Sequence, residues 1–206
     1  MFARKSSKFL VKILEFKKLE NLDGLEKMEP LGITVHYLGS HDVASAVNHL
    51  RTNNLAYHVI IDRAGVAWQM ANFERRVNHA GVASWRGKSP NRSHIAVAVS
   101  SWGQLKFEDK KLKTWAGTLY APESAIYRAG NLGLAKTWWD GITEPQELAL
   151  MDCLKHLIHS HKIDSENVCG HDECALPHGR KSDPGGVLPF KMSELRAILK
   201  AQVSTT

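Results

Sequence analysis

One short segment near the C-terminus concentrates side chains that could bind a metal ion or transfer a proton. Residues 169–186 read CGHDECALPHGRKSDPGG, and their glycines and prolines exclude one continuous helix. A catalytic zinc needs about three protein ligands and one position left open for water, and two histidines with one carboxylate form such a set. His171 and Asp183 of this segment, with His36 far upstream, are candidates, although spacing alone does not separate them from the other histidines.

The three cysteines offer a second interpretation of the same segment, because Cys169 and Cys174 flank His171. A structural zinc site built from cysteines normally has paired Cys-x-x-Cys spacing, which is absent. An odd number of cysteines also argues against a disulfide framework. We therefore expect three free thiols, with Cys153 in the core of a helix that leaves His156 and His159 exposed.

The elements that must position these residues alternate between strands and helices, which predicts an α/β class of fold: a single domain with a central mixed sheet flanked by helices. Residues 32–38 alternate in the manner of a half-buried strand, with His36 near its end on the face opposite Ile33 and Val35. Further strands are predicted at 57–70 (a hairpin around Asp-Arg-Ala-Gly), 94–102 and 167–171. Helices are predicted at 41–54, with Asp42 as the N-cap, at 143–162, where Thr143 and Gln146 form a capping box, and at 188–200.

Composition fits one globular domain. Of 206 residues, 43% are hydrophobic and 23% charged, and no apolar run approaches the roughly 20 residues of a membrane span. We divide the chain into a basic amphipathic segment and linker (1–30) and a catalytic domain (31–206). The N-terminus lacks a small-residue cleavage site, so we reject a secretory signal and expect a cytoplasmic site of synthesis.

Most of the net charge of +6 comes from residues 1–18, which contain six Lys and Arg residues against Glu15 alone. The apolar residues of this segment fall mostly on one face if it is helical: Phe9, Leu10, Ile13, Leu14 and Phe16. One interpretation is a helix that packs its apolar stripe on the main domain. The other is contact with an anionic membrane or wall surface; we do not expect nucleic acid as a partner.

Five segments, in order, resemble the type-2 N-acetylmuramoyl-L-alanine amidases, a family that shares its fold with peptidoglycan recognition proteins and the amidase-type phage lysozymes. They span roughly residues 32 to 190. The segments read TVHYLG, AYHVIIDRAG, VNHAGVASWRGK, NRSHIAVAVSSWG and GHDECALPHGRKSDPGG.

The resemblance implies that His36, His171 and Asp183 bind one catalytic zinc ion, with Lys181 and Tyr57 beside it as catalytic residues. It also implies hydrolysis of the amide between N-acetylmuramic acid and the L-alanine of the stem peptide, with a zinc-activated water. His79, Trp85 and Asn91 would then line the groove for a peptidoglycan or muropeptide substrate. We expect a monomer.

Two departures from the family pattern concern the chemistry. Some members carry a glutamate as general base in the strand that aligns with HIAVAV, where this chain has Ala98. We therefore expect the version of the mechanism that relies on Tyr57 and Lys181. The loop from His171 to Asp183 is also longer than usual, which makes His178 a candidate near-metal residue.

Three biological settings are open at this level. The basic N-terminal segment favours a phage or prophage endolysin that acts on the cell wall after release. A cytoplasmic muropeptide-recycling amidase and a non-catalytic peptidoglycan-binding protein are the alternatives. Residues 103–142 are expected to form a loop-rich insertion, whose aromatic residues either stack on sugar rings or pack into a buried cluster.

Overall fold

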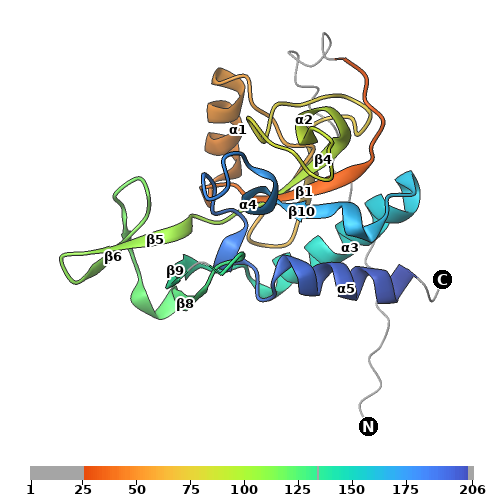
Figure 1. Cartoon of the computed structure of the whole chain (residues 1–206). Coiled ribbons are helices and arrows are strands. Elements are labelled where there is room, and N and C mark those ends of the chain that lie inside the picture. The colour runs from red at the N-terminus through yellow and green to blue at the C-terminus, as the bar shows by residue number, and fades with distance from the viewer. Residues whose placement is uncertain (1–25, 134, 204–206) are drawn as a thin grey trace.

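The computed structural model describes residues 26–133 and 135–203, and its centre is a five-stranded mixed sheet (Figure 1). All neighbouring strands pair in parallel except the last two, which form the predicted hairpin. The α/β fold with a central mixed sheet is therefore confirmed. In order across the sheet, the strands are β10 (Val168–Gly170), β1 (Gly32–Tyr37), β4 (His94–Val99), β2 (Val59–Ile61) and β3 (Ala67–Gln69).

Side chains alternate along the central strands and give the sheet two different faces. Ile33 and Val35 point into the main hydrophobic core, whereas Thr34 and His36 point to the opposite face. All four residues are fully buried, so the prediction of a half-buried strand is wrong. The reason is that β1 lies between two parallel neighbours and is covered on both faces, as parallel strands usually are.

Two long helices, α3 (Glu144–His161) and α5 (Met192–Val203), cover the apolar face of the sheet (Figure 1). The predicted capping box at the start of α3 is present: Thr143 Oγ1 accepts from the Gln146 amide, and Gln146 Oε1 accepts from the Thr143 amide. As predicted, Cys153 is buried, whereas His156 and His159 are exposed.

The opposite face is covered by α1 (Val43–Thr52), by the short helix α2 (Pro90–Ser93) and by the loops between β3 and α2 (Figure 1). Asp42 caps α1 as predicted, because its side chain accepts a hydrogen bond from the Ser45 amide. A small apolar cluster of Ala71, Val77 and Ala96 packs here, with Tyr57 against it. This face therefore holds few apolar residues and several buried polar ones.

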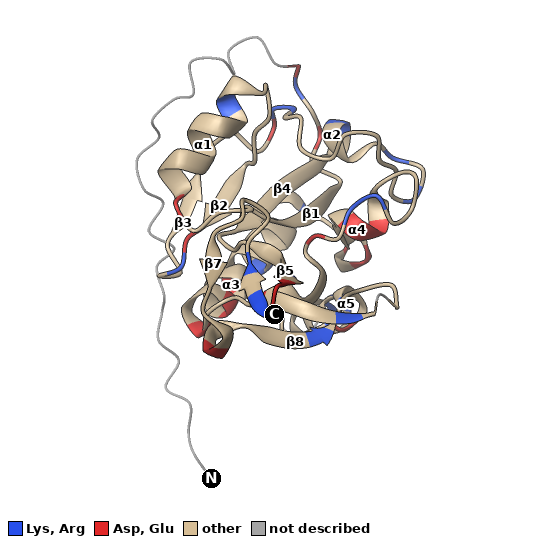
Figure 2. Cartoon of the chain, turned by 90° about the vertical axis from the view of Figure 1, so that its left-hand side faces the viewer, with Lys and Arg blue, Asp and Glu red and all other residues tan. Residues whose placement is uncertain are grey.

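Residues 26–30, placed in the predicted linker, pack against the domain. The Met28 amide donates to the Glu74 carbonyl, and the Met28 side chain joins the main core. The predicted basic helix within residues 1–18 lies outside the described residues. In Figure 2, Lys and Arg residues of the described chain are spread over α1, the loops near α2 and α4 (His171–Cys174), and β8 (Ile126–Ala129). None of the described helices is long and apolar enough to span a membrane.

Residues 103–142 form a second, antiparallel sheet, so the prediction of a loop-rich insertion is wrong. Its hairpins extend from the main body as an arm (Figure 1). Most of its strands are too short, and too often charged on exposed positions, to show the alternation that identifies a strand in sequence. In order, the strands are β7 (Leu119–Tyr120), β6 (Lys111–Lys113), β5 (Gly103–Glu108), β9 (Lys136–Asp140) and β8.

The aromatic residues of this second sheet divide between buried and exposed environments, and their expected stacking on sugar rings stays a prediction. Trp139 is buried and lies so close to Gly185 and Gly186 that a Cβ atom at either glycine would clash with its ring. Trp115 and Tyr127 are 61% and 56% exposed. The buried tryptophan matters more for the site, because it packs on the backbone just after Asp183.

Asp140, at the end of β9, joins the two sheets. Its fully buried carboxylate accepts hydrogen bonds from His41 Nε2 (2.5 Å), the Tyr120 hydroxyl (2.6 Å) and the Trp102 amide (2.6 Å). Burial raises the pKa of Asp140, but these hydrogen bonds outweigh it and hold that pKa below its usual value.

We expect Asp140→Ala to lower the free energy of unfolding by about 3–5 kcal/mol, because three donors would lose a buried charged acceptor. Urea denaturation of the metal-free protein measures this change. Asp152→Ala, on the exposed side of α3, is the matched control and should change stability by less than about 0.5 kcal/mol. A loss below about 1 kcal/mol for Asp140→Ala would show that the carboxylate is dispensable for joining the sheets.

Candidate metal centre

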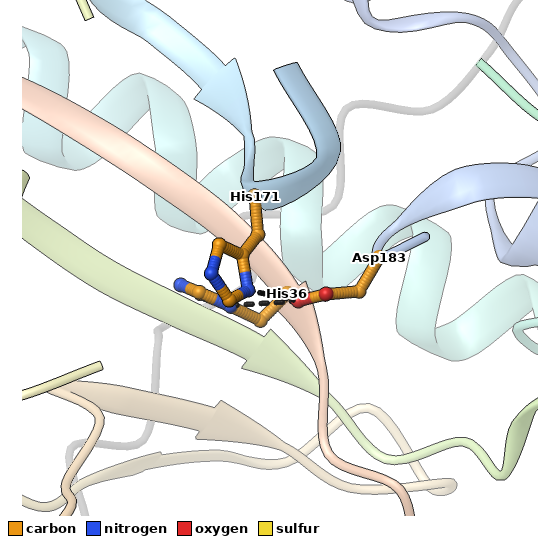
Figure 3. A group of neighbouring side chains, drawn as sticks. All are labelled: His36, His171 and Asp183. Carbon is orange, nitrogen blue, oxygen red and sulfur yellow. Dashed lines mark hydrogen bonds and ion pairs between the residues drawn. The ribbon is translucent and has the colours of Figure 1, made fainter. Parts of the chain in front are cut away.

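Three residues predicted as metal ligands converge at one edge of the central sheet. His36 is the second-last residue of β1, and His171 is the first residue of α4, directly after β10. Because β1 and β10 are parallel neighbours, their C-terminal ends lie at the same edge. Asp183 reaches this edge from the loop between α4 and α5. Figure 3 shows the three side chains pointing toward one another.

The ligand-type atoms of this group are within hydrogen-bond distance of one another. Asp183 Oδ2 lies 2.8 Å from His36 Nδ1 and 2.9 Å from His171 Nδ1. All three residues are buried, with 7% exposure or less. No second group of three or more metal-binding side chains occurs within residues 26–133 and 135–203. The three cysteines are free and buried.

The position of the proton on the His171 ring indicates that a cation fits between His171 Nδ1 and Asp183. His171 Nε2 lies 3.0 Å from the Ala80 carbonyl oxygen, which can only accept, so the proton of the neutral ring must be on Nε2. The lone pair of Nδ1 then faces the Asp183 carboxylate. A positive charge between these atoms removes the repulsion, and imidazole with carboxylate is a donor set that zinc prefers.

The charge states of the group point the same way. Burial lowers the pKa of His36 to about 4, although its close contact with Asp183 acts in the opposite direction. Burial raises the pKa of Asp183, but the close contacts with His171 and His36 lower it by more, so the net pKa is well below its usual value. At neutral pH, His36 is therefore neutral and Asp183 is ionised, which are the forms that bind a metal.

The backbone ties the two downstream ligands together. The Asp172 amide donates to the Asp183 carbonyl at 2.6 Å, so the loop that carries Asp183 is fastened to the first turn of α4. Asn131, between β8 and β9, donates from Nδ2 to Asp172 Oδ2 at 3.0 Å. The second sheet therefore supports the metal group from one side. Neither Asp172 nor Asn131 was predicted, because their partners lie on distant segments.

The structure brings His79 and Asn91 to the same place. His79 Nδ1 lies 2.9 Å from His36 Nε2. Asn91 Oδ1 accepts from the amides of His79 (3.0 Å) and Ala80 (2.9 Å), and its Nδ2 donates to the Gly81 carbonyl (2.9 Å). Both side chains are thus engaged within the protein, and their expected contacts with substrate stay predictions.

Tyr57 and Lys181, the two predicted catalytic residues, also lie beside the group. The ring centre of Tyr57 is 4.9 Å from that of His36. Burial raises the pKa of Tyr57 well above its usual value, so its hydroxyl keeps its proton at neutral pH. Lys181 is exposed, and its positive charge adds a minor contribution, after burial, to the low pKa of His36.

Trp85 is placed away from the metal group. Its indole Nε1 donates to the Glu166 carbonyl (3.3 Å), and its ring lies 5.4 Å from the Arg196 guanidinium. It lines a cavity of about 230 Å³ together with Leu31 and His94, which stand at the N-terminal ends of β1 and β4. The structure therefore places Trp85 at the opposite end of the sheet from Asp183, and its predicted place in the groove receives no support.

Two further sequence-based expectations concern the surroundings of His36. Ala98 pairs with His36 in the parallel register of β1 and β4 and is fully buried, so no carboxylate stands beside His36 on that strand. His178 is exposed and is not part of the converging group. Arg180 was overlooked, although its Nη2 donates to the carbonyls of Ala80 and Val82 at 2.9 Å. In the sequence it looks like an ordinary loop charge.

Comparison with known proteins agrees with the fold and shows the family. A family model described as N-acetylmuramoyl-L-alanine amidase matches residues 26–186. This match covers most of the chain, and the protein therefore belongs to the N-acetylmuramoyl-L-alanine amidase family. A search of curated protein sequences finds no match.

Several solved structures share the fold at identities too low to show more than the fold. AmiD from E. coli, solved with anhydro-N-acetylmuramic acid-L-Ala-D-gamma-Glu-L-Lys, has a TM-score of 0.60 and 21% identity over 85% of this chain and 59% of its own. AmpDh3 from Pseudomonas aeruginosa, solved with anhydromuramic pentapeptide, has a TM-score of 0.56 and 22% identity over 84% and 60%. The endolysin LysCS from Clostridium intestinale has a TM-score of 0.53 and 15% identity over 84% and 85%. The chain thus spans about three fifths of the length of AmiD and AmpDh3.

Proposed function

We propose that the protein is a zinc-dependent peptidoglycan hydrolase that cleaves the amide between N-acetylmuramic acid and the L-alanine of the stem peptide. Membership of the amidase family supports the reaction. The observation that carries the proposal is the convergence of His36, His171 and Asp183, since two histidines and one carboxylate form the protein part of an open catalytic zinc site.

The residues around the group supply distinct parts of the chemistry. A zinc ion held by the three ligands would lower the pKa of a water molecule and polarise the scissile carbonyl. The Lys181 ammonium stabilises the negative charge that develops on the carbonyl oxygen as the amide is attacked. Tyr57, which keeps its proton, donates a hydrogen bond to the attacking oxygen or to the developing oxyanion.

The buried Ala98 favours a mechanism without a glutamate base on β4. A buried alanine beside His36 offers no proton acceptor. Tyr57 and Lys181 lie near His36, and both carry a proton, so their part is to stabilise the attacking oxygen and the developing oxyanion.

We assign peptidoglycan or a muropeptide as substrate because AmiD and AmpDh3 were solved with anhydromuramoyl peptides. Of the two catalytic settings, we favour a phage or prophage endolysin that is made in the cytoplasm and acts on the wall after release. The basic segment 1–18 supports this choice, since an anionic wall or membrane attracts such a segment, whereas a small substrate needs no surface contact. A recycling amidase is the second candidate.

A non-catalytic peptidoglycan-binding protein is the alternative from another functional class. Family members that only bind peptidoglycan usually lack one of the three zinc ligands, whereas this chain has all three. The enzyme is therefore the better supported proposal.

Digestion of purified sacculi tests the proposed reaction. We expect the zinc-loaded protein to release free L-alanine amino termini, a chelator to stop the release, and added zinc to restore it. Zinc-loaded protein that binds sacculi without releasing amino termini would establish the binding protein instead.

The same assay separates the two catalytic settings. We expect faster cleavage of sacculi than of soluble anhydromuramoyl peptides, and a chain without residues 1–18 should lose this advantage while cleaving the soluble substrate at the same rate. Preference of the full chain for the soluble substrate would favour the recycling enzyme, and unchanged sacculus cleavage by the shortened chain would reject the surface contact.

A further inference from the structure

The turn formed by residues 79–81 contacts both histidines of the metal group on the side away from Asp183. His36 Nε2 lies 2.9 Å from His79 Nδ1, and His171 Nε2 lies 3.0 Å from the Ala80 carbonyl oxygen. One turn therefore meets the outward nitrogen of each ring. The proposed reaction uses neither contact.

These contacts decide which nitrogen of each ring is available to a metal. A neutral imidazole has a single proton, and the hydrogen bond at one nitrogen fixes the state of the other. The Ala80 carbonyl holds the proton of His171 on Nε2. His79 Nδ1 can either donate or accept; when it accepts, the proton of His36 is on Nε2 as well. Both Nδ1 atoms then direct a lone pair toward Asp183.

The turn is held in place by side chains that contact neither ring. Asn91 makes three hydrogen bonds to the backbone of residues 79–81, and Arg180 donates to the carbonyls of Ala80 and Val82. Gly81 has φ of +59°, a conformation that favours glycine. His79 itself is buried, and its Nε2 makes no hydrogen bond of ordinary geometry. Its side chain interacts with His36 and with the backbone of Pro90.

We propose that residues 79–81 form a positioning turn, in which His79 and the Ala80 carbonyl keep the outward nitrogens of both histidines protonated so that the two Nδ1 atoms bind the metal. His79 and Asn91 are then positioning residues that act through the ligands. The inference rests on the proposed zinc site and concerns how that site is organised. Partners of this kind typically contribute about 10–100-fold in metal affinity.

Two substitutions at His79 test the acceptor directly. His79→Asn places an amide oxygen near the position of Nδ1 and can still accept the proton of His36 Nε2, whereas His79→Leu has a similar shape without an acceptor. We expect His79→Leu to bind zinc at least about tenfold more weakly than the natural chain, and His79→Asn to recover most of this loss. Competition with a chromophoric chelator, without substrate, measures the zinc dissociation constant.

Further variants keep the test decisive. His156→Asn and His156→Leu, on the exposed side of α3, are matched controls and should leave zinc affinity unchanged. Asn91→Ala loosens the turn without altering either ring, and we expect zinc affinity to fall by about tenfold. Unchanged affinity in His79→Leu, or equal losses in the Leu and Asn variants, would overturn the proposal. If His79→Leu does not fold, as judged by circular dichroism, unchanged affinity in Asn91→Ala would overturn it.

This test is independent of the proposed reaction. A protein with the expected zinc affinities that releases no amino termini from sacculi would contradict the hydrolase and leave the positioning turn standing. An active amidase whose zinc affinity is insensitive to His79 and Asn91 would do the reverse.

Discussion

Asp183→Asn is expected to abolish amidase activity, with a loss on the order of 1,000-fold or more in kcat/KM, because the site loses the one negative charge that holds the cation. Asparagine keeps the shape of the side chain, so folding can be compared directly by circular dichroism. Zinc affinity should fall together with activity, since the amide oxygen is a much weaker ligand than a carboxylate. Chelator competition and release of L-alanine amino termini from sacculi measure the two effects.

The position of Asp183 explains why no neighbour can replace it. Its Oδ2 atom meets both Nδ1 atoms, and its low pKa keeps it ionised at neutral pH. Asp172 lies next to His171 but bonds to Asn131, on the second sheet. Asp152→Asn, on the surface of α3, is the matched control and should leave both measurements unchanged. Zinc affinity and activity near natural values in Asp183→Asn would mean that the metal, if bound, is held elsewhere.

Lys181→Met is expected to lower kcat by about 100–1,000-fold while zinc affinity stays within about threefold, because the side chain stabilises charge that develops only during the reaction. Removal of one such donor typically has an effect of this size. Lys181 is two residues before Asp183, on an exposed part of the loop where a substrate can reach it. Steady-state kinetics on a defined muropeptide separate kcat from KM.

Two comparisons make the Lys181 prediction specific. Lys181→Arg keeps the positive charge and should recover part of the activity. Lys191→Met, at another exposed lysine of the same C-terminal region, should behave as the natural chain. A kcat for Lys181→Met within about twofold of the natural value would remove Lys181 from the mechanism and leave Tyr57 as the main group that stabilises charge.

Part of the fold could be predicted because its signals are local. Asp42 and Thr143 cap helices through hydrogen bonds to residues three positions away, and such caps are visible in the sequence. The alternation around His36 correctly placed it opposite Ile33 and Val35. That this strand is covered on both faces depends on β4 and β10, which come from remote parts of the chain.

The second sheet shows where local signals fail. Its short strands pair with one another across several turns, and charged residues interrupt their apolar pattern. Trp139 and Trp115 have the same residue type, but one packs against Gly185 and the other is exposed. Trp139 lies on β9, which pairs with β5 and β8, whereas Trp115 lies in the turn between β6 and β7.

Residues 79–85 show most clearly that residues close together in the sequence can lie far apart relative to the site. His79 and Trp85 lie in one segment that resembles the amidase family, and both were expected in the groove. The chain between them pairs with residues 174–176 and runs to the other end of the sheet, so only His79 reaches the metal group. A segment of this length is long enough to run from one end of the strands to the other, and its sequence does not show where it turns.

By itself, the sequence determined the family, the residue types that can hold a zinc ion and the starts of α1 and α3, because motifs and caps depend on residues close together in the chain; the last helix, predicted at 188–200, is instead Met192–Val203. The tertiary structure decided which atoms of those residues meet and what stands behind them. His36 and His79 are 43 positions apart, and His171 and Ala80 are 91 apart. Hydrogen bonds over such separations exist only after the sheet has formed, so the direction of each ring nitrogen is a property of the fold.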